Sequence, residues 1–250
     1  MTKFVVFTTP RTGSSLLIKT LDSHPEIFCA GELFFFKGDI YRTECRYPFW
    51  RFSFLSNKLN YVLNYPKLFI SLNGFLNKFY ADKNKPAIKA KGFKLMLFQT
   101  YYTPGILNYL KKNNVKVILL IRKNVLRNTL SDLRARSTKV YHNQSDADTL
   151  TMPMFKVDVE ELKKKMHQIE NFDKQLENST ADLDRKIIYY EDFENWEATI
   201  SGTLNYLNVA DMPLKAAQKK LNPNNLENMI ENYDEVSKWL NTNGYGKYLD

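Results

Sequence analysis

The stretch KFVVFTTPRTGSSLL at residues 3–17 decides the fold of this chain. Its first seven residues are mostly β-branched or aromatic, which is typical of a buried parallel strand, and this strand ends at Pro10. A tight loop follows, and beyond it Leu16, Leu17 and Leu21 share one face of a helix. A strand, a loop and a helix in this order direct backbone N–H groups and the positive end of the helix at one point. The sequence therefore predicts an anion site in the loop.

Further apolar segments along the chain alternate with helical ones. The composition of buried strands recurs at residues 88–97, 115–121 and 185–190. Helical spacing of apolar residues occurs near 104–113 and in the segments that begin at Val125, Val159 and Trp196. Strands that alternate with helices predict an α/β fold with a central parallel sheet and right-handed crossovers. We expect a single domain over residues 1–250.

Two segments interrupt this alternation. Residues 45–85 are dense in aromatic side chains and predict a helical insertion of two helices, broken near Pro66. The longest charge-free stretch there, 68–77, is about half of the length that spans a membrane, so no transmembrane helix is expected. Residues 137–156 lack periodicity and are rich in polar and turn residues, which predicts a mobile loop of the kind that covers a site.

The composition excludes several classes of protein. With 44% hydrophobic and 25% charged residues, the chain has enough apolar material for a sizeable core and is not disordered. Two cysteines cannot build a disulfide framework or a zinc cage, so no metal site is expected. The first apolar run is too short for a signal peptide. We therefore expect a cytoplasmic protein.

Charge is divided unevenly along the chain. Residues 1–150 carry 24 Lys and Arg against 9 Asp and Glu, whereas residues 151–250 carry 12 against 18. The basic part predicts an anionic partner, either nucleic acid or a multiply phosphorylated small molecule. The sequence has no zinc-finger spacing, RNP-like segment or basic region with heptads, and this favours the small molecule. A non-catalytic basic module that binds an anionic polymer stays as an alternative.

The loop supplies groups that suit a phosphate or a sulfate. Gly13 allows close approach of the backbone, and Ser14 and Ser15 add hydroxyl donors. Arg11 offers a planar fork of N–H groups. A nucleotide-binding small-molecule kinase is the alternative enzyme, although the loop lacks the lysine and the G-x-x-x-x-G-K-[ST] spacing that such an enzyme uses. The structural alternative makes Ser14 a helix N-cap and Arg11 a surface charge.

The motif P-R-T-G-S-S-L-L, directly after an N-terminal strand, resembles the 5′-phosphosulfate loop of sulfotransferases that use PAPS (3′-phosphoadenosine 5′-phosphosulfate). The continuation LDSHPEIFCAGELF resembles the same stretch in bacterial carbohydrate sulfotransferases and tyrosylprotein sulfotransferases. ILLIRKNVLRNTLSDLRA resembles the 3′-phosphate segment of the family, and GFKLM, IIYYEDF and ENYDEV with LNTNGY resemble further segments. The likeness covers nearly the whole chain except 45–85 and 137–156. It implies a P-loop-like, three-layer α/β/α fold.

The resemblance implies two groups of residues that bind the donor. The 5′-phosphosulfate would be bound by the loop and the start of its helix, which are Arg11, Thr12, Gly13, Ser14, Ser15 and Leu16. The 3′-phosphate would be bound by Arg122 or Lys123 together with Ser131. The family commonly places an arginine eight residues before this serine, a position that Lys123 occupies here. A lysine binds phosphate as a point charge and an arginine binds it with two N–H groups, so both residues stay candidates.

The resemblance also implies a reaction. The family uses a glutamate after the loop helix as the general base, and here this residue is Glu32. A turn at His24 and Pro25 lets residues 27–32 return beside the loop. Glu32 would take the proton of an acceptor hydroxyl during in-line attack on sulfur, and Arg11 would stabilise the leaving phosphate. The acceptor would be a carbohydrate in preference to a tyrosine, the product of the donor would be adenosine 3′,5′-bisphosphate, and no metal is needed.

Overall fold

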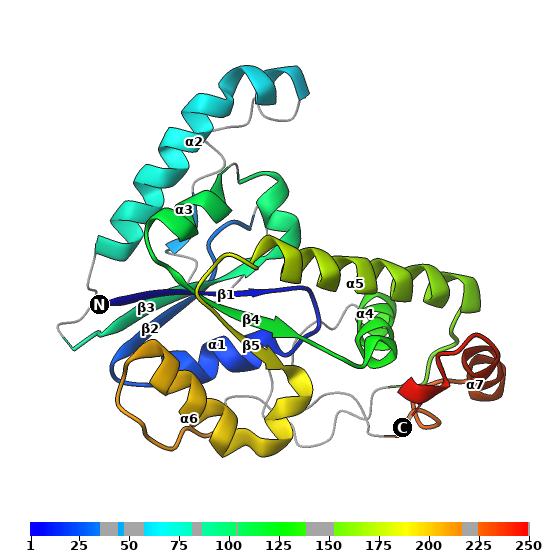
Figure 1. Cartoon of the computed structure of the whole chain (residues 1–250). Helices are drawn as coiled ribbons and strands as arrows, with labels where there is room; N and C mark the ends of the chain where they lie inside the picture. The colour runs from blue at the N-terminus through cyan, green and yellow to red at the C-terminus, as the bar shows by residue number, and fades with distance from the viewer. Residues whose placement is uncertain are drawn as a thin grey trace. The chain divides into compact units, whose positions relative to one another are not determined.

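Five parallel strands form the central sheet of the structure, a computed structural model that describes residues 1–35, 45–47, 58–81, 87–103, 105–138, 153–216 and 225–249. The strands are β1 (Thr2–Thr8), β2 (Ile27–Glu32), β3 (Ala90–Met96), β4 (Lys116–Ile121) and β5 (Arg185–Tyr189). Their order across the sheet is β2-β3-β1-β4-β5, and each neighbouring pair is parallel (Figure 1). All five carboxyl ends therefore lie at one edge of the sheet.

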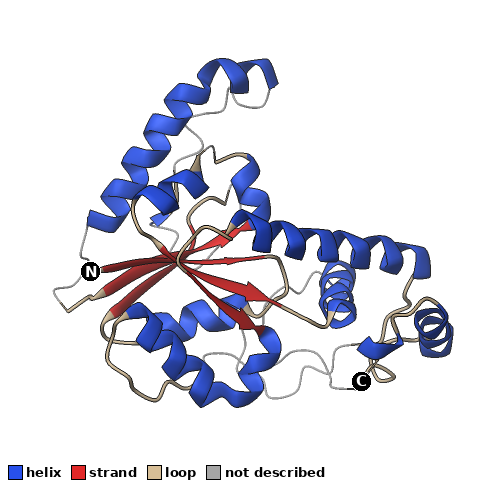
Figure 2. Ribbon diagram, in the orientation of Figure 1, coloured by secondary structure: helices blue, strands red, loops and turns tan. Residues whose placement is uncertain are grey.

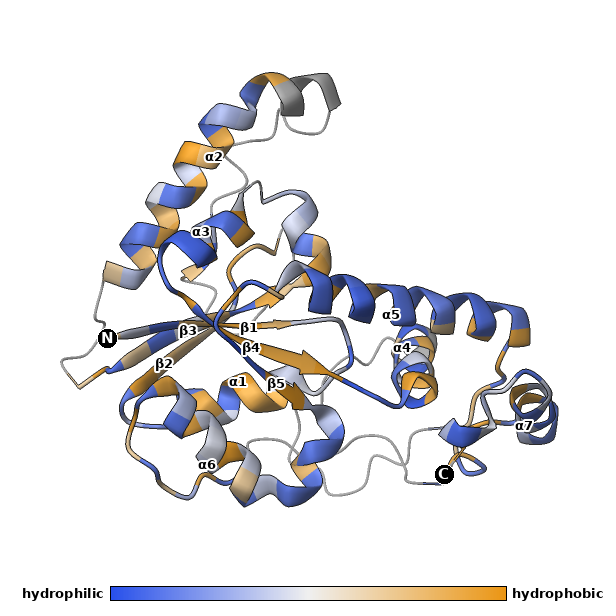
Figure 3. Cartoon of the chain, viewed as in Figure 1, coloured by the Kyte–Doolittle hydropathy of each residue, from blue (hydrophilic) through white to orange (hydrophobic). Residues whose placement is uncertain are grey.

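Two helices, α1 (Ser14–Asp22) and α6 (Trp196–Leu207), cover one face of this sheet (Figure 2). Phe4 and Val6 of β1 belong to the same hydrophobic cluster as Leu17 of α1 and Leu204 of α6. Alternate residues of a strand point to opposite faces, so the even-numbered residues of β1 face α1. The interior strand β4 is among the most hydrophobic segments in Figure 3, as expected of a strand in a sheet that is covered on both faces.

The opposite face of the sheet is covered by α2 (Lys58–Ala81) and α3 (Ile106–Lys112) (Figures 1 and 2). Leu68, Leu72 and Leu76 of α2 are fully buried and recur at helical spacing. The hydroxyl of Tyr80, near the end of α2, donates to the backbone carbonyl of Phe4 at 2.9 Å. The fold is therefore α/β with helices on both faces of a parallel sheet, as the sequence predicts.

The prediction of two helices broken near Pro66 is wrong, because α2 runs through Pro66 without a break. A proline inside a helix removes one backbone hydrogen bond and leaves a carbonyl group without its donor one turn earlier. Pro66 itself is exposed, so its ring displaces no core side chain. The buried leucines that follow Pro66 stabilise the rest of the helix. The remainder of the predicted insertion 45–85 lies largely outside the described residues.

The chain divides into two compact units. The first comprises Met1–Ile121 and Gln175–Ala217, and it contains the sheet and the helices above; the second comprises Arg122–Lys174 and Gln218–Asp250. The second unit contains α4 (Val125–Thr138), most of α5 (Val159–Ser179) and α7 (Tyr233–Thr242). Its own hydrophobic cluster includes residues from these three helices. The expectation of one domain over 1–250 stays a prediction.

The ends of the predicted loop at 137–156 are more regular than expected. Residues 137–138 belong to the last turn of α4. Phe155 forms an isolated parallel bridge with Ile230. Residues 139–152 lie outside the described residues, so the mobility of the loop stays a prediction.

Candidate functional site

The loop between β1 and α1 contains two residues in the left-handed backbone conformation. Arg11 has a φ of 65° and Gly13 a φ of 81°. A Cβ atom on Gly13 would lie 2.7 Å from Cδ2 of Tyr190 and 3.3 Å from Cε2 of Phe193. The dihedral angle and the packed rings therefore both require glycine at this position. A left-handed arginine costs free energy, and such residues cluster where ligands bind.

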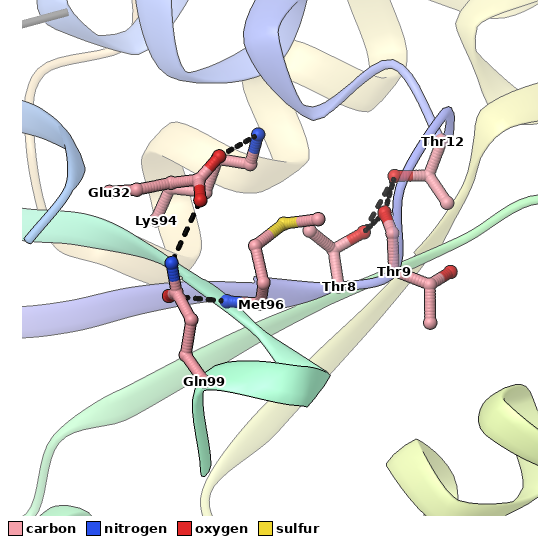
Figure 4. A network of polar contacts seen from close by, with 7 residues as sticks. All are labelled: Thr8, Thr9, Thr12, Glu32, Lys94, Met96 and Gln99. Carbon is pink, nitrogen blue, oxygen red and sulfur yellow. Dashed lines mark hydrogen bonds and ion pairs between the residues drawn. The ribbon is translucent and has the colours of Figure 1, made fainter. Parts of the chain in front are cut away.

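Two threonine hydroxyls hold this loop against the sheet (Figure 4). Oγ1 of Thr8 lies 2.6 Å from Oγ1 of Thr12 and donates to the carbonyl oxygen of Leu120 on β4 at 2.7 Å. The Thr12 hydroxyl also lies 3.1 Å from the carbonyl oxygen of Thr9. Because Thr12 is fully buried, its side chain supports the loop, and a contact from Thr12 to a ligand would come from its backbone.

The N-terminus of α1 is open to an anion. Gly13 is the N-cap residue, and within the described residues no side chain caps the helix. The backbone N–H of Leu17 donates to the carbonyl of Gly13 at 3.1 Å, so the N–H groups of Ser14, Ser15 and Leu16 come before the first helical hydrogen bond. These groups and the helix dipole favour a negative charge. The alternative in which Ser14 is the N-cap is wrong, because Gly13 occupies that position.

A bulge at the end of β2 sets the direction of Glu32. Cys29 pairs with Gly92 of β3, but the register shifts by one residue after Ala30, so that Glu32 pairs with Lys94. Side chains alternate between the faces of a strand, and the extra residue therefore turns Glu32 to the face on which Cys29 packs against α1. With regular alternation, Glu32 would point to the opposite face of the sheet.

Lys94 and Gln99 hold the carboxylate of Glu32 (Figure 4). Nζ of Lys94 lies 3.0 Å from Oε1, and Nε2 of Gln99 donates to Oε2 at 2.8 Å. Oε1 of Gln99 accepts a hydrogen bond from the backbone N–H of Met96 at 3.0 Å. The side chains of Lys94 and Glu32 are only 9% and 14% exposed. The carboxylate is thus fixed by a nearly buried charge on one oxygen and an amide on the other.

Tyr102 is a further neighbour of this carboxylate. Its hydroxyl donates to the backbone carbonyl of Phe34 at 2.8 Å. Burial, and to a lesser degree the negative charge of Glu32, raise the pKa of Tyr102 well above its usual range. The phenol therefore keeps its proton at neutral pH and stays a hydrogen-bond donor.

The loop and Glu32 lie at the same edge of the sheet. Residues 27–32 return as β2, and β3 separates this strand from β1. In the paired register Thr8 lies opposite Met96, while Glu32 lies opposite Lys94 on the other side of β3. An acceptor at this edge would meet a fixed carboxylate on the same face as the helix N-terminus. That combination suits proton removal beside a bound anion.

The second predicted group of residues follows β4. Arg122 is buried, Lys123 is exposed, and Ser131 of α4 is buried. Asn124 caps α4, because its Oδ1 accepts a hydrogen bond from the backbone N–H of Arg127 at 2.9 Å. These residues belong to the second compact unit, whereas the loop and Glu32 belong to the first.

Sequence reasoning missed the partners of Glu32. The sequence presents GFKLM, which contains Lys94, only as a segment similar to one of the family, and it gives no sign of a role for Gln99 or Tyr102. The lysine at the centre of an otherwise apolar strand is a signal that could have found the pair, since a buried charge needs a partner. The sequence pattern does not predict the strand β2. Gly31 is the one residue in the local sequence that is typical of a bulge.

Two other features are absent from the described residues. Among them, no group of three or more His, Cys, Asp or Glu side chains is placed to hold a metal ion. None of the helices in the described ranges has both the length and the apolar character that crossing a membrane requires.

Comparisons with known proteins give the fold. No family model and no curated protein sequence matches the chain. A crystal structure of a sulfotransferase from Alicyclobacillus acidocaldarius matches with a TM-score of 0.52 and 13% identity, over 99% of this chain and 92% of that one. The sulfotransferase domain from the curacin biosynthetic pathway matches with a TM-score of 0.52 and 15% identity, over 95% and 83%. The chain therefore has the α/β fold found in these sulfotransferases.

Proposed function

We propose that this protein is a PAPS-dependent sulfotransferase that transfers a sulfuryl group to a hydroxyl of an acceptor, with Glu32 as the general base. The observation that carries the proposal is the uncapped N-terminus of α1 behind the loop PRTGSS, at the carboxyl edge of a sheet whose fold is shared with solved sulfotransferases. The same edge carries the fixed carboxylate.

The residues of the loop fit the 5′ end of such a donor. The first-turn N–H groups of α1, at Ser14, Ser15 and Leu16, would bind the phosphosulfate oxygens, because they lack helical partners. Gly13 gives the loop its left-handed turn and packs against the rings of Tyr190 and Phe193, and Arg11 would add charge-assisted hydrogen bonds to those oxygens. The described loop and first turn contain no acidic residue that would repel the anion.

For the 3′-phosphate we favour Arg122 over Lys123, with Ser131 as its partner. Arg122 is buried, and a buried guanidinium is desolvated already, so that a phosphate gains more from its N–H groups than from an exposed ammonium. Lys123 is exposed and would act only as a point charge from solvent.

Glu32 would act on the acceptor. PAPS, when bound, supplies the sulfuryl group, and its 5′-phosphate is the leaving group. The carboxylate of Glu32 accepts the proton from the attacking hydroxyl, while Lys94 and Gln99 keep its two oxygens in place. Arg11 and the loop N–H groups stabilise the charge that develops on the phosphate. No residue in this scheme needs a metal ion.

The acceptor class rests on the sequence, and the location rests on the cysteines. We propose a carbohydrate hydroxyl, because several segments of the chain resemble those of bacterial carbohydrate sulfotransferases, and a cytoplasmic protein, because Cys29 and Cys45 are both free thiols.

Calorimetry with adenosine 3′,5′-bisphosphate, ATP and duplex DNA tests the proposal. We expect tight binding of the bisphosphate without metal, and weaker binding of ATP and DNA. Arg11→Ala and Ser131→Ala should each weaken the bisphosphate by about tenfold or more, since each removes a hydrogen bond to a charged group. If neither substitution changed its affinity, the assignment of the donor site would be abandoned. Preference for ATP or DNA would support a kinase or a basic binding module instead.

A further inference from the structure

Asn128, in the second turn of α4, has a side chain without a partner in the described part of the chain. The residue is 1% exposed, yet neither its Nδ2 nor its Oδ1 makes a hydrogen bond there. Buried amide groups almost always have partners, because leaving one without a hydrogen bond costs stability. An unsatisfied amide of this kind calls for an explanation, and a bound ligand is one.

The position of Asn128 on α4 shows which residues share its face of the helix. Asn128 and Ser131 are three residues apart and therefore share one face of α4, and Ala135, also buried, continues it. The opposite face packs into the hydrophobic cluster of the second unit through Leu126, Leu130 and Leu133, while Val125, at the start of the helix, also belongs to this cluster. The buried polar stripe is therefore not part of that core. A core residue would also have been apolar or satisfied, as the neighbouring Thr129 is: its hydroxyl donates to the carbonyl of Val125 at 2.9 Å.

The donors and the acceptor of the Asn128 amide indicate which groups a ligand must offer. Nδ2 has two N–H donors and Oδ1 is an acceptor, so full satisfaction needs a ligand with an acceptor and a donor close together. A phosphate alone offers mainly acceptors. A ribose that carries a 3′-phosphate beside a free 2′-hydroxyl offers both on neighbouring carbon atoms.

We propose that Asn128 is a donor-binding residue, whose Nδ2 donates to the 3′-phosphate and whose Oδ1 accepts from the 2′-hydroxyl of the same ribose. This inference rests on the proposed function and extends it, because Asn128 lies on the same face as Ser131 but is not among the residues to which the resemblance assigns a role. It also gives the site a way to distinguish a 3′-phosphorylated ribonucleotide from other adenine nucleotides.

The test compares Asn128→Ala with Thr129→Ala, an adjacent and equally buried control. Calorimetry with adenosine 3′,5′-bisphosphate should show affinity about 10- to 100-fold weaker for Asn128→Ala, which loses a hydrogen bond to a charged group, and unchanged within about twofold for Thr129→Ala. Thermal unfolding of the ligand-free proteins should show the reverse order. Asn128→Ala should leave the Tm unchanged or raise it by about 2 to 4 °C, since an unsatisfied group is removed, whereas Thr129→Ala should lower it.

The analogue 2′-deoxyadenosine 3′,5′-bisphosphate tests the second contact. It should bind the wild type about tenfold more weakly than the ribonucleotide, and Asn128→Ala should show little of this preference. Affinity for the ribonucleotide within twofold of wild type in Asn128→Ala would overturn the role of Asn128 and leave the proposed function intact. Absence of binding by the wild type would overturn both.

Discussion

The loop after β1 and the carboxylate at the end of β2 are built in different ways, although both lie at one edge of the sheet. The loop is shaped mainly by its own residues, through two left-handed backbone positions and the contact between Thr8 and Thr12, and the hydrogen bond from Thr8 to Leu120 ties it to β4. Glu32 is placed by residues more than 60 positions away, since Lys94 and Gln99 hold it and the pairing with β3 sets its face. A short sequence motif can thus specify most of an anion site, whereas the position of the carboxylate depends on strand pairing in the sheet.

The largest effect is expected at the carboxylate itself. Glu32→Gln keeps the shape of the side chain and removes its ability to accept a proton, so sulfuryl transfer should fall by about a hundredfold or more. Affinity for adenosine 3′,5′-bisphosphate should hardly change, because that depends on the loop. Single-turnover transfer from labelled PAPS at saturating donor measures the rate, and a rate within about threefold of wild type would refute the base role.

Removal of the charge partner tests how Glu32 is held. Lys94→Met leaves a nearly buried carboxylate without its cation, which should cost about 3 kcal/mol of unfolding free energy. The double variant Lys94→Met with Glu32→Gln should recover part of this loss, because no charge is then left unpaired. Urea unfolding of the two single variants and the double variant measures the coupling. Strictly additive losses would show that the two side chains do not depend on each other.

A substitution in the loop after β1 tests whether the shape of the loop depends on its own residues. Gly13→Ala forces a left-handed alanine against the rings of Tyr190 and Phe193, and should lower the unfolding free energy by about 2 kcal/mol. It should also weaken binding of adenosine 3′,5′-bisphosphate.

Gly74→Ala in α2 is the matched control. An added Cβ meets nothing within 4 Å there, so the variant should gain about 0.5 to 1 kcal/mol from helix propensity, with unchanged binding. Equal stability of the two variants would contradict the requirement for glycine at position 13.

The smallest effect is expected at the start of β2. The backbone N–H of Ala210, and next the ammonium of Lys89, lower the pKa of the Glu26 carboxyl below 4.5. A carboxyl with a lowered pKa in the folded state stabilises the protein above its ordinary pKa, and this contribution is lost as the pH falls through the lowered value. Glu26→Gln should therefore be slightly less stable than wild type at pH 7, and the difference should shrink as the pH falls, as measured by urea unfolding over a series of pH values. A difference that stays constant as the pH falls would argue against this linkage.

By itself the sequence determined the parts of this protein that depend on neighbours along the chain. The apolar runs of β1, β3, β4 and β5 and the loop PRTGSS are local patterns, and each lies in the structure close to where the pattern predicts it. Such patterns work because strand burial and the geometry of a tight loop are governed by a few successive residues.

Only the tertiary structure decided the rest. Continuity of α2 through Pro66 depends on the buried leucines that follow it, whose burial outweighs the lost hydrogen bond. The direction of Glu32 depends on a one-residue shift in pairing with β3, and a side-chain period of two means that such a shift reverses which face the residue occupies. The partners Lys94 and Gln99 and the unsatisfied amide of Asn128 became visible for the same reason: a buried polar group is defined by what surrounds it in space, which local sequence does not specify.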